Sequence, residues 1–166
     1  EIEEGYAPLI NDNYIVDEVK EVADFITVDN NSSAVAAVIY ALDNGKIKFE
    51  GLTVTSESDS GVIAISSLTD EPLENTDNIL LTALCDAVNT DMKWDGEHML
   101  EYGHGPVQIK VMQAEIELKV SGKMRIRSIG PEAQTTGEVS TEYKNGILKF
   151  KLGEENPGMY YLITRE

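Results

Sequence analysis

The chain has 166 residues, and its 13 Lys and Arg against 30 Asp and Glu give a formal net charge of −17. An apolar fraction of 42% supports one domain with a buried core, and the lack of any long uninterrupted apolar run excludes a membrane span. The acidic balance excludes a nucleic-acid binder of the usual kind, because phosphate contacts need a basic face. The single cysteine, Cys85, excludes an internal disulfide framework, and we expect it to be a buried structural thiol.

The first stretch with a periodic pattern is residues 14–28. Apolar residues recur there at helical spacing, with Glu and Lys between them, so a short helix and a strand fit about equally well. We assign residues 1–24 as a lead-in segment or linker. We expect a single β-sandwich to occupy residues 25–166.

Strand signals follow along the first half of the chain. The apolar run 35–42 ends at Asp43-Asn44-Gly45, and residues 46–54 then alternate polar and apolar. Because Asn-Gly favours a tight turn, we expect these two runs to form an antiparallel hairpin. Residues 62–65 are a short apolar run that predicts a buried central strand.

The second half repeats the pattern. Residues 115–120 and 123–129 alternate around Ser121-Gly122, which predicts a hairpin with one apolar face on each strand. A second hairpin is predicted from 139–143 and 147–152 around Asn145-Gly146. A last strand, 159–164, follows Pro157-Gly158 and should bury one of its two adjacent tyrosines.

Short strands with turn signals every 8–12 residues are typical of sandwiches and barrels. We therefore expect an all-β fold: an antiparallel β-sandwich, jelly-roll-like or immunoglobulin-like, with about ten short strands and room for a short N-terminal helix.

The sequence offers no positive argument for catalysis. Paired carboxylates can cleave glycosidic bonds, but thirty acidic residues make accidental pairs almost certain. His98 and His104 match no zinc-site spacing, and we expect them in an exposed loop. Oxygen-rich loops leave a structural Ca²⁺ open, without matching an EF-hand; they are 11–13, 29–31, 57–59 and 70–77.

Trp94, the only tryptophan, lies in an irregular polar stretch with Tyr102, Asp95 and Asn89. Flat aromatic rings beside amide or carboxylate groups suit sugar rings, so these four residues are the candidate carbohydrate-binding site. The alternative is that Trp94 covers one end of the core.

The middle of the chain resembles a known family region. The segments Asn78–Ala83 (NILLTA), Ala87–Thr90 (AVNT), Met92–Trp94 (MKW) and Gly105–Val107 (GPV) are similar to the C-terminal accessory region of large secreted bacterial glycoside hydrolases. Weaker likeness extends over residues 25–166. Leu84-Cys85-Asp86 departs from the family's Val-Gly-Arg at that place.

This resemblance implies a non-catalytic β-sandwich joined to a polysaccharide-degrading enzyme and located outside the cell. The family's catalytic (β/α)₈ barrel needs about 250 residues, so it is not contained in this chain. The implied function is a carbohydrate-binding or substrate-targeting module, with a plant or other polysaccharide as partner. The alternative is a structural module that packs against the catalytic domain of the same polypeptide and stabilises it. An exposed Trp94 platform would favour the first, and an exposed apolar patch of several hundred Å² the second.

Overall fold

The computed structural model describes residues 18–22, 25–29, 36–40, 46–49, 51–58 and 61–166, with side chains from residue 46 onward. Every regular element in these ranges is a β-strand, and all strand pairs are antiparallel. The predicted all-β class is therefore confirmed. Among the described residues there is no helix with the length and apolar character needed to cross a bilayer.

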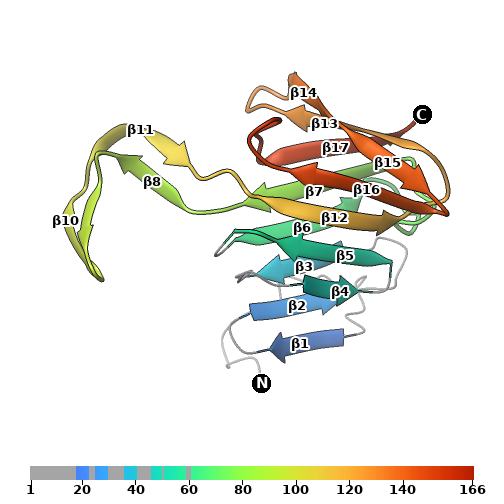
Figure 1. The fold of residues 1–166 in the computed structure, drawn as a ribbon, viewed down its shortest axis with the longest axis horizontal. Coiled ribbons are helices and arrows are strands. Elements are labelled where there is room, and N and C mark those ends of the chain that lie inside the picture. The colour runs from blue at the N-terminus through green and yellow to red at the C-terminus, as the bar shows by residue number, and fades with distance from the viewer. Residues whose placement is uncertain (1–17, 23–24, 30–35, 41–45, 50, 59–60) are drawn as a thin grey trace.

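Two sheets form the body of the molecule (Figure 1). The larger sheet has eight strands, in the order β1 (Glu18–Val22), β2 (Phe25–Asp29), β3 (Ala36–Tyr40), β6 (Val62–Ser67), β7 (Asn78–Leu84), β17 (Tyr160–Arg165), β13 (Met124–Ile129) and β14 (Thr135–Val139). The smaller sheet has five, in the order β15 (Thr141–Lys144), β16 (Ile147–Leu152), β12 (Ala114–Lys119), β5 (Leu52–Ser56) and β4 (Lys46–Phe49).

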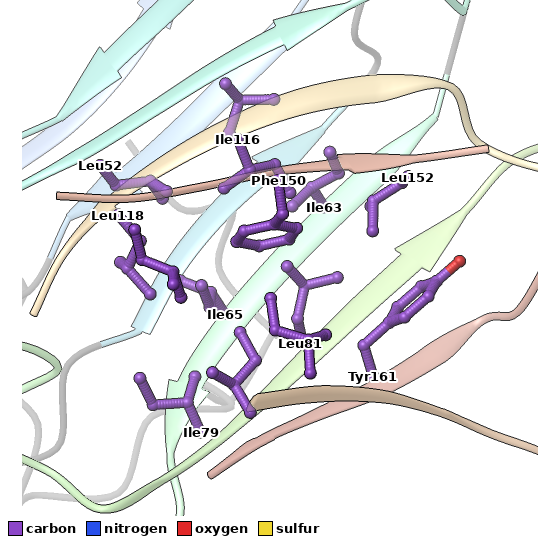
Figure 2. Packing of buried hydrophobic residues seen from close by; sticks show 14 of the residues in the cluster. Leu52, Ile63, Ile65, Ile79, Leu81, Ile116, Leu118, Phe150, Leu152 and Tyr161 are labelled. Carbon is purple, nitrogen blue, oxygen red and sulfur yellow. The ribbon is translucent and has the colours of Figure 1, made fainter. Parts of the chain in front are cut away.

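The core lies between the two sheets, as the predicted sandwich requires (Figure 2). Alternation along each strand sends one set of side chains inward, because successive residues point to opposite faces of a sheet. On β12, Ile116 and Leu118 are buried while Glu115 and Glu117 face outward, where both contact Lys149. The predicted central strand 62–65 lies within β6, between β3 and β7.

The hairpin predicted around Asn145-Gly146 is confirmed. β15 pairs with β16, and both turn residues have positive φ, 53° and 81°, which a two-residue hairpin of type I′ needs. The last predicted strand is β17, on which Tyr161 is fully buried and Tyr160 is exposed. The Tyr161 hydroxyl donates to the carbonyl oxygens of Asn156 and Gly158, each at 3.1 Å, and burial raises the pKa of this phenol to about 12.

The first predicted hairpin is wrong. The strand within 35–42 is β3, which pairs with β2 and β6 in the larger sheet, whereas β4 belongs to the smaller sheet. Gly51, with φ of +82°, turns the chain inside the predicted strand 46–54, so that β4 and β5 pair with each other. The Asn44-Gly45 turn lies outside the described residues.

The hairpin predicted around Ser121-Gly122 is also wrong, although both strands exist. β12 lies in the smaller sheet and β13 in the larger, so this connection crosses the sandwich. The crossing lets the apolar faces of the two strands, Ile116 with Leu118 and Met124 with Ile126, enter the core from opposite sides. The alternation of apolar and polar residues determines which side chains point into the core. It does not determine which strands pair with each other.

The helical alternative for 14–28 is wrong over the part of this stretch that the structure describes. β1 and β2 pair over Glu18–Val22 and Phe25–Asp29 and form one edge of the larger sheet. The described residues contain 17 strands against the ten expected. Four of the additional strands come from the irregular stretch around Trp94.

Candidate functional site

Residues 86–110 form a projecting β-ribbon, here called the arm. It leaves the sandwich between β7 and β12 and stands clear of both sheets (Figure 1). Its root is the pair β8 (Ala87–Thr90) and β11 (His104–Ile109), and its tip is the pair β9 (Lys93–Asp95) and β10 (His98–Glu101). One root strand continues from the larger sheet and the other leads into the smaller sheet.

Two glycines with positive φ and two irregularities in strand register determine the shape of the arm. Gly96, with φ of +58°, is the first of the two residues that join β9 to β10, a position that favours glycine in hairpins. Gly103 has φ of +67°, and a Cβ atom there would lie 2.2 Å from the carbonyl oxygen of Thr90. Irregular register between Met99 and Glu101, and again between His104 and Val107, interrupts both ladders. The ribbon bends between its root pair and its tip pair, and these breaks lie on either side of the bend (Figure 1).

Polar side chains of the arm are largely used in its own structure. The Asn89 amide donates to the Tyr102 carbonyl oxygen at 2.9 Å, and the Thr90 hydroxyl donates to that of Pro106 at 2.8 Å. Lys93 and Glu101 form an ion pair at 2.7 Å across the tip. Exposed contacts of this kind contribute about 0–1 kcal/mol each, so they define the shape of the arm more than they stabilise it.

Apolar side chains are exposed along the whole arm. Seven of the ten large apolar side chains that are exposed in the described residues belong to it. Their exposed fractions run from 36% to 75%; they are Val88, Trp94, Met99, Leu100, Tyr102, Val107 and Ile109. They lie on both faces of the ribbon, since Val88 pairs with Gln108 and therefore points away from the face of Val107 and Ile109. Clustered exposed apolar side chains are typical of interaction sites.

The structure does not gather the four predicted carbohydrate-binding residues on one face of the arm. Trp94 is 53% exposed, opposite Met99 on the tip, so the alternative that it covers one end of the core is wrong. Asp95 follows Trp94 on β9, and its side chain therefore points to the other face of the ribbon. Asn89 and Tyr102 are brought together, but the amide of Asn89 is engaged by a backbone carbonyl. The Tyr102 side chain is the most exposed of the four, at 75%.

No group of three or more His, Cys, Asp or Glu side chains able to hold a metal ion occurs among the described residues. His104 contacts Asp91 at 3.0 Å, and His98 pairs in register with Asp95. Of the predicted Ca²⁺ loops, 11–13 lies outside the described residues, and 29–31 and 57–59 lie partly outside them.

An apolar hollow of about 420 Å³ lies at the root of the arm. Its lining includes Ile109 from the arm, Ile129 at the end of β13, Pro131 in the loop that follows, and Met159 just before β17. Val107 and Ile109 lie two residues apart on β11 and so share one face, which runs into the hollow. Nearby, Cys85 is half-buried rather than fully buried, with its sulfur 3.8 Å from that of Met112.

Sequence reasoning found the aromatic residues of the arm and missed its aliphatic ones, Met99, Leu100, Val107 and Ile109. Val107 and Ile109 alternate with polar residues, but the same alternation predicts a buried face wherever a second layer covers the strand. No protein-family model, no curated protein and no solved structure matches this chain.

Proposed function

We propose that this chain is a non-catalytic module that binds a protein surface through its arm and so holds a neighbouring domain or subunit in place. The observation that carries the proposal is the set of seven apolar side chains exposed on a ribbon that adds nothing to the core of the described residues. The exposed apolar surface is the feature expected of the structural alternative, whereas the exposure of Trp94 is the feature expected of the substrate-targeting one.

The composition of the arm supports protein binding. Tyr, Trp and Met are enriched at protein interfaces, and the aliphatic residues beside them gain about 25 cal/mol for each Å² removed from water. An isolated two-stranded ribbon is marginally stable in water. Contact with a partner would therefore both cover the apolar side chains and stabilise the ribbon.

The resemblance to the accessory region of secreted bacterial glycoside hydrolases supports a partner domain in the same polypeptide. Three of the matching segments are arm residues: Ala87–Thr90, Met92–Trp94 and Gly105–Val107. On this reading the catalytic barrel supplies the chemistry and the module supports it, outside the cell. The secreted location is part of the proposal.

Photo-cross-linking tests the proposal directly. A photoreactive residue at position 100, on the arm, is compared with one at position 68, a leucine outside the arm that is 55% exposed against 64% for Leu100. In cells that naturally make the protein, we expect the residue at position 100 to form a cross-link to a peptide of the neighbouring domain or subunit. The residue at position 68 should form at most traces of cross-linked product. Equal yields at the two positions, or none at position 100, would contradict the proposal.

A second candidate function is carbohydrate binding at the tip, supported by the exposure of Trp94 and Tyr102. It is tested by affinity electrophoresis against a panel of plant polysaccharides, with Trp94→Ala as the variant. Retardation by one polysaccharide that Trp94→Ala abolishes would establish it. Absence of retardation throughout would leave protein docking as the function. Chromogenic glycosides should show no turnover in either case.

A further inference from the structure

The outer faces of the two sheets differ in chemistry. On the smaller sheet, most outward positions of β12 and β16 are charged; they are Glu115, Glu117, Lys119, Lys149 and Lys151. In the described strands β6, β7 and β17 of the larger sheet, no outward position holds a charged residue. Apolar residues occupy half of these positions; they are Val62, Ala64, Leu80, Leu84 and Leu162. The smaller sheet therefore has a surface suited to water, and the larger sheet does not.

The sequence of the larger sheet is that of a sheet covered on both faces. Val62–Ile65 and Ile79–Leu81 are uninterrupted apolar runs, whereas β12 alternates strictly between apolar and polar residues. Uninterrupted runs are typical of strands that are buried on both sides. The core covers one side of the larger sheet, and the described strands form no third layer over the other. We infer that a further layer belongs on this outer face.

One arginine on the same face lacks a partner. Both neighbours of Arg127 on β13 are buried, so its side chain points outward, and it lies in register with Leu162 and Glu138. Its Nε atom is buried and has no hydrogen-bond partner in the part of the chain that the structure describes. Glu138 contacts Arg125 instead, at 3.2 Å. Buried polar groups of native proteins are nearly always hydrogen-bonded, so an acceptor for Arg127 is missing.

We propose that the neighbouring domain that holds the arm also covers the outer face of the larger sheet and places a carboxylate on Arg127. This inference rests on the proposed docking function and adds a second contact to it. A guanidinium group binds a carboxylate through two parallel N–H···O bonds, which are stronger than neutral hydrogen bonds. Apolar surroundings strengthen them further because they exclude water. The partner surface is therefore apolar, with an Asp or Glu side chain opposite Arg127.

The hollow at the root of the arm connects the two contact surfaces. Ile129 lines this hollow and is in register with Tyr160, a 38% exposed residue of β17. From the other side, the face of the arm that carries Val107 and Ile109 runs into the same hollow. One partner can therefore contact the arm, the hollow and the sheet without a gap. This continuity is the reason for assigning both surfaces to the same domain.

Local charge favours an acidic group at this position, although the chain as a whole has a net charge of −17. The outward positions of β13 and β14 hold Arg125 and Arg127 against Glu138, a local excess of one positive charge. At physiological salt, charges more than about 8 Å away are largely screened, so the local excess dominates the contact. Residues 1–17 contain five acidic and no basic residues and are the competing occupant that the test must separate.

Photo-cross-linking from the sheet tests the inference. A photoreactive residue at position 162 is compared with one at position 53. Leu162 and Thr53 are both half-buried, and each points outward from an inner strand of its sheet. In cells that naturally make the protein, position 162 should form a cross-link to the domain that position 100 reaches, in a peptide that contains Asp or Glu. Equal yields at positions 162 and 53, or a cross-link from 162 to residues 1–17, would overturn the inference.

Substitution of Arg127 tests the carboxylate contact. Arg127→Met should lower the yield at position 162 by about tenfold or more, because the carboxylate of the partner would be buried without its cation. Lys149→Met removes a half-buried cation from the other outer face and should leave this yield unchanged. Arg127→Glu should also abolish the cross-link, and exchange of the acidic residue in the cross-linked peptide for Arg should restore it. An unchanged yield in Arg127→Met would overturn the contact.

Urea unfolding of the whole chain separates a role in docking from a role in the fold. Because Arg127→Met removes a buried donor that has no partner, the midpoint should stay the same or rise. A lower midpoint would show that Arg127 supports the fold itself and would overturn the inference. A cross-link at position 100 with none at position 162 would overturn this inference alone. No cross-link at position 100 would overturn the docking function, whatever the result at position 162.

Discussion

Two strands of equal length show what separates the sandwich from the arm. β12 and β11 have six residues each, and both pair in antiparallel ladders. On β12 every second side chain is buried, whereas on β11 all six residues are exposed. The difference is the second sheet, which faces β12 across the core and has no counterpart over β11 in the described residues. Hydrogen-bonded pairing is sufficient to form a strand, but a buried core requires a second layer that covers one face of the sheet.

This comparison implies two levels of stability in one chain. The sandwich is held by a contiguous apolar core, and the arm by local turns and exposed polar contacts. Regions with few buried apolar contacts open at lower free energy than the core does. We therefore expect the arm to exchange its amide hydrogens while the sandwich stays folded. Substitutions in the two regions test this separation.

The largest contrast is expected from the same substitution in the two regions. Leu81→Ala, in the core, should lower the free energy of unfolding by about 2–5 kcal/mol, because it removes buried methyl groups and leaves a cavity. Leu100→Ala, on the arm, should change it by less than about 0.5 kcal/mol. Urea denaturation measures both values. Equal losses would show that the arm folds as part of the sandwich.

Two glycines sharpen the comparison through backbone contacts. Gly61→Ala would place a Cβ 2.3 Å from the Met112 methyl carbon and 2.6 Å from the Leu84 carbonyl oxygen. Overpacking of this kind should cost the sandwich about 1–3 kcal/mol. Gly103→Ala would place a Cβ 2.2 Å from the Thr90 carbonyl oxygen, but on the arm. It should speed hydrogen exchange in residues 87–109 and leave global unfolding unchanged.

The buried phenol of Tyr161 predicts a pH dependence that belongs to the sandwich alone. Burial raises the pKa of Tyr161 to about 12 in the folded state, against about 10 for an unfolded tyrosine. The neutral phenol therefore stabilises the fold fully below pH 10, and this contribution is lost as pH rises toward 12. At about 1.4 kcal/mol for each pKa unit, the loss approaches about 2 kcal/mol.

Tyr161→Phe should remove this alkaline decline. It should also cost about 1 kcal/mol at pH 7, because two carbonyl oxygens lose their donor. Tyr160→Phe, at the exposed neighbour, is the matched control and should keep the decline. A decline that persists in Tyr161→Phe would assign it to another group.

The smallest effect is expected at the ion pair of the tip. Lys93→Met removes the contact with Glu101, and both side chains are more than half exposed. The free energy of unfolding should change by less than about 0.5 kcal/mol, with or without added salt. Thermal unfolding at two ionic strengths measures this. A larger loss would mean that the tip contributes to the cooperative unit.

The fold class, the sandwich and most strands could be predicted from the sequence because alternation reports directly which side chains turn inward. Ile116, Leu118, Met124 and Ile126 are all buried, as their spacing requires. Strand partners were harder to predict. Neither Lys46–Phe49 nor Met124–Ile129 pairs with the strand expected from its nearest turn, because sheet order depends on contacts between distant residues.

The sequence predicted where the candidate site lies, but not which residues dominate its surface. The stretch around Trp94 was identified by its aromatic rings and polar neighbours, and it is the arm. Its aliphatic residues were not identified, since Val107 and Ile109 have the same spacing as core residues. Only the three-dimensional arrangement shows that no described residue covers them.

The two root strands of the arm enter different layers of the body, β8 from the larger sheet and β11 toward the smaller. A mechanical load applied at Trp94 would therefore be transmitted to both sheets through the two root strands. Neither layer could be drawn outward without the other. A connection to both sheets suits an element that transmits force or restrains the movement of a bound partner.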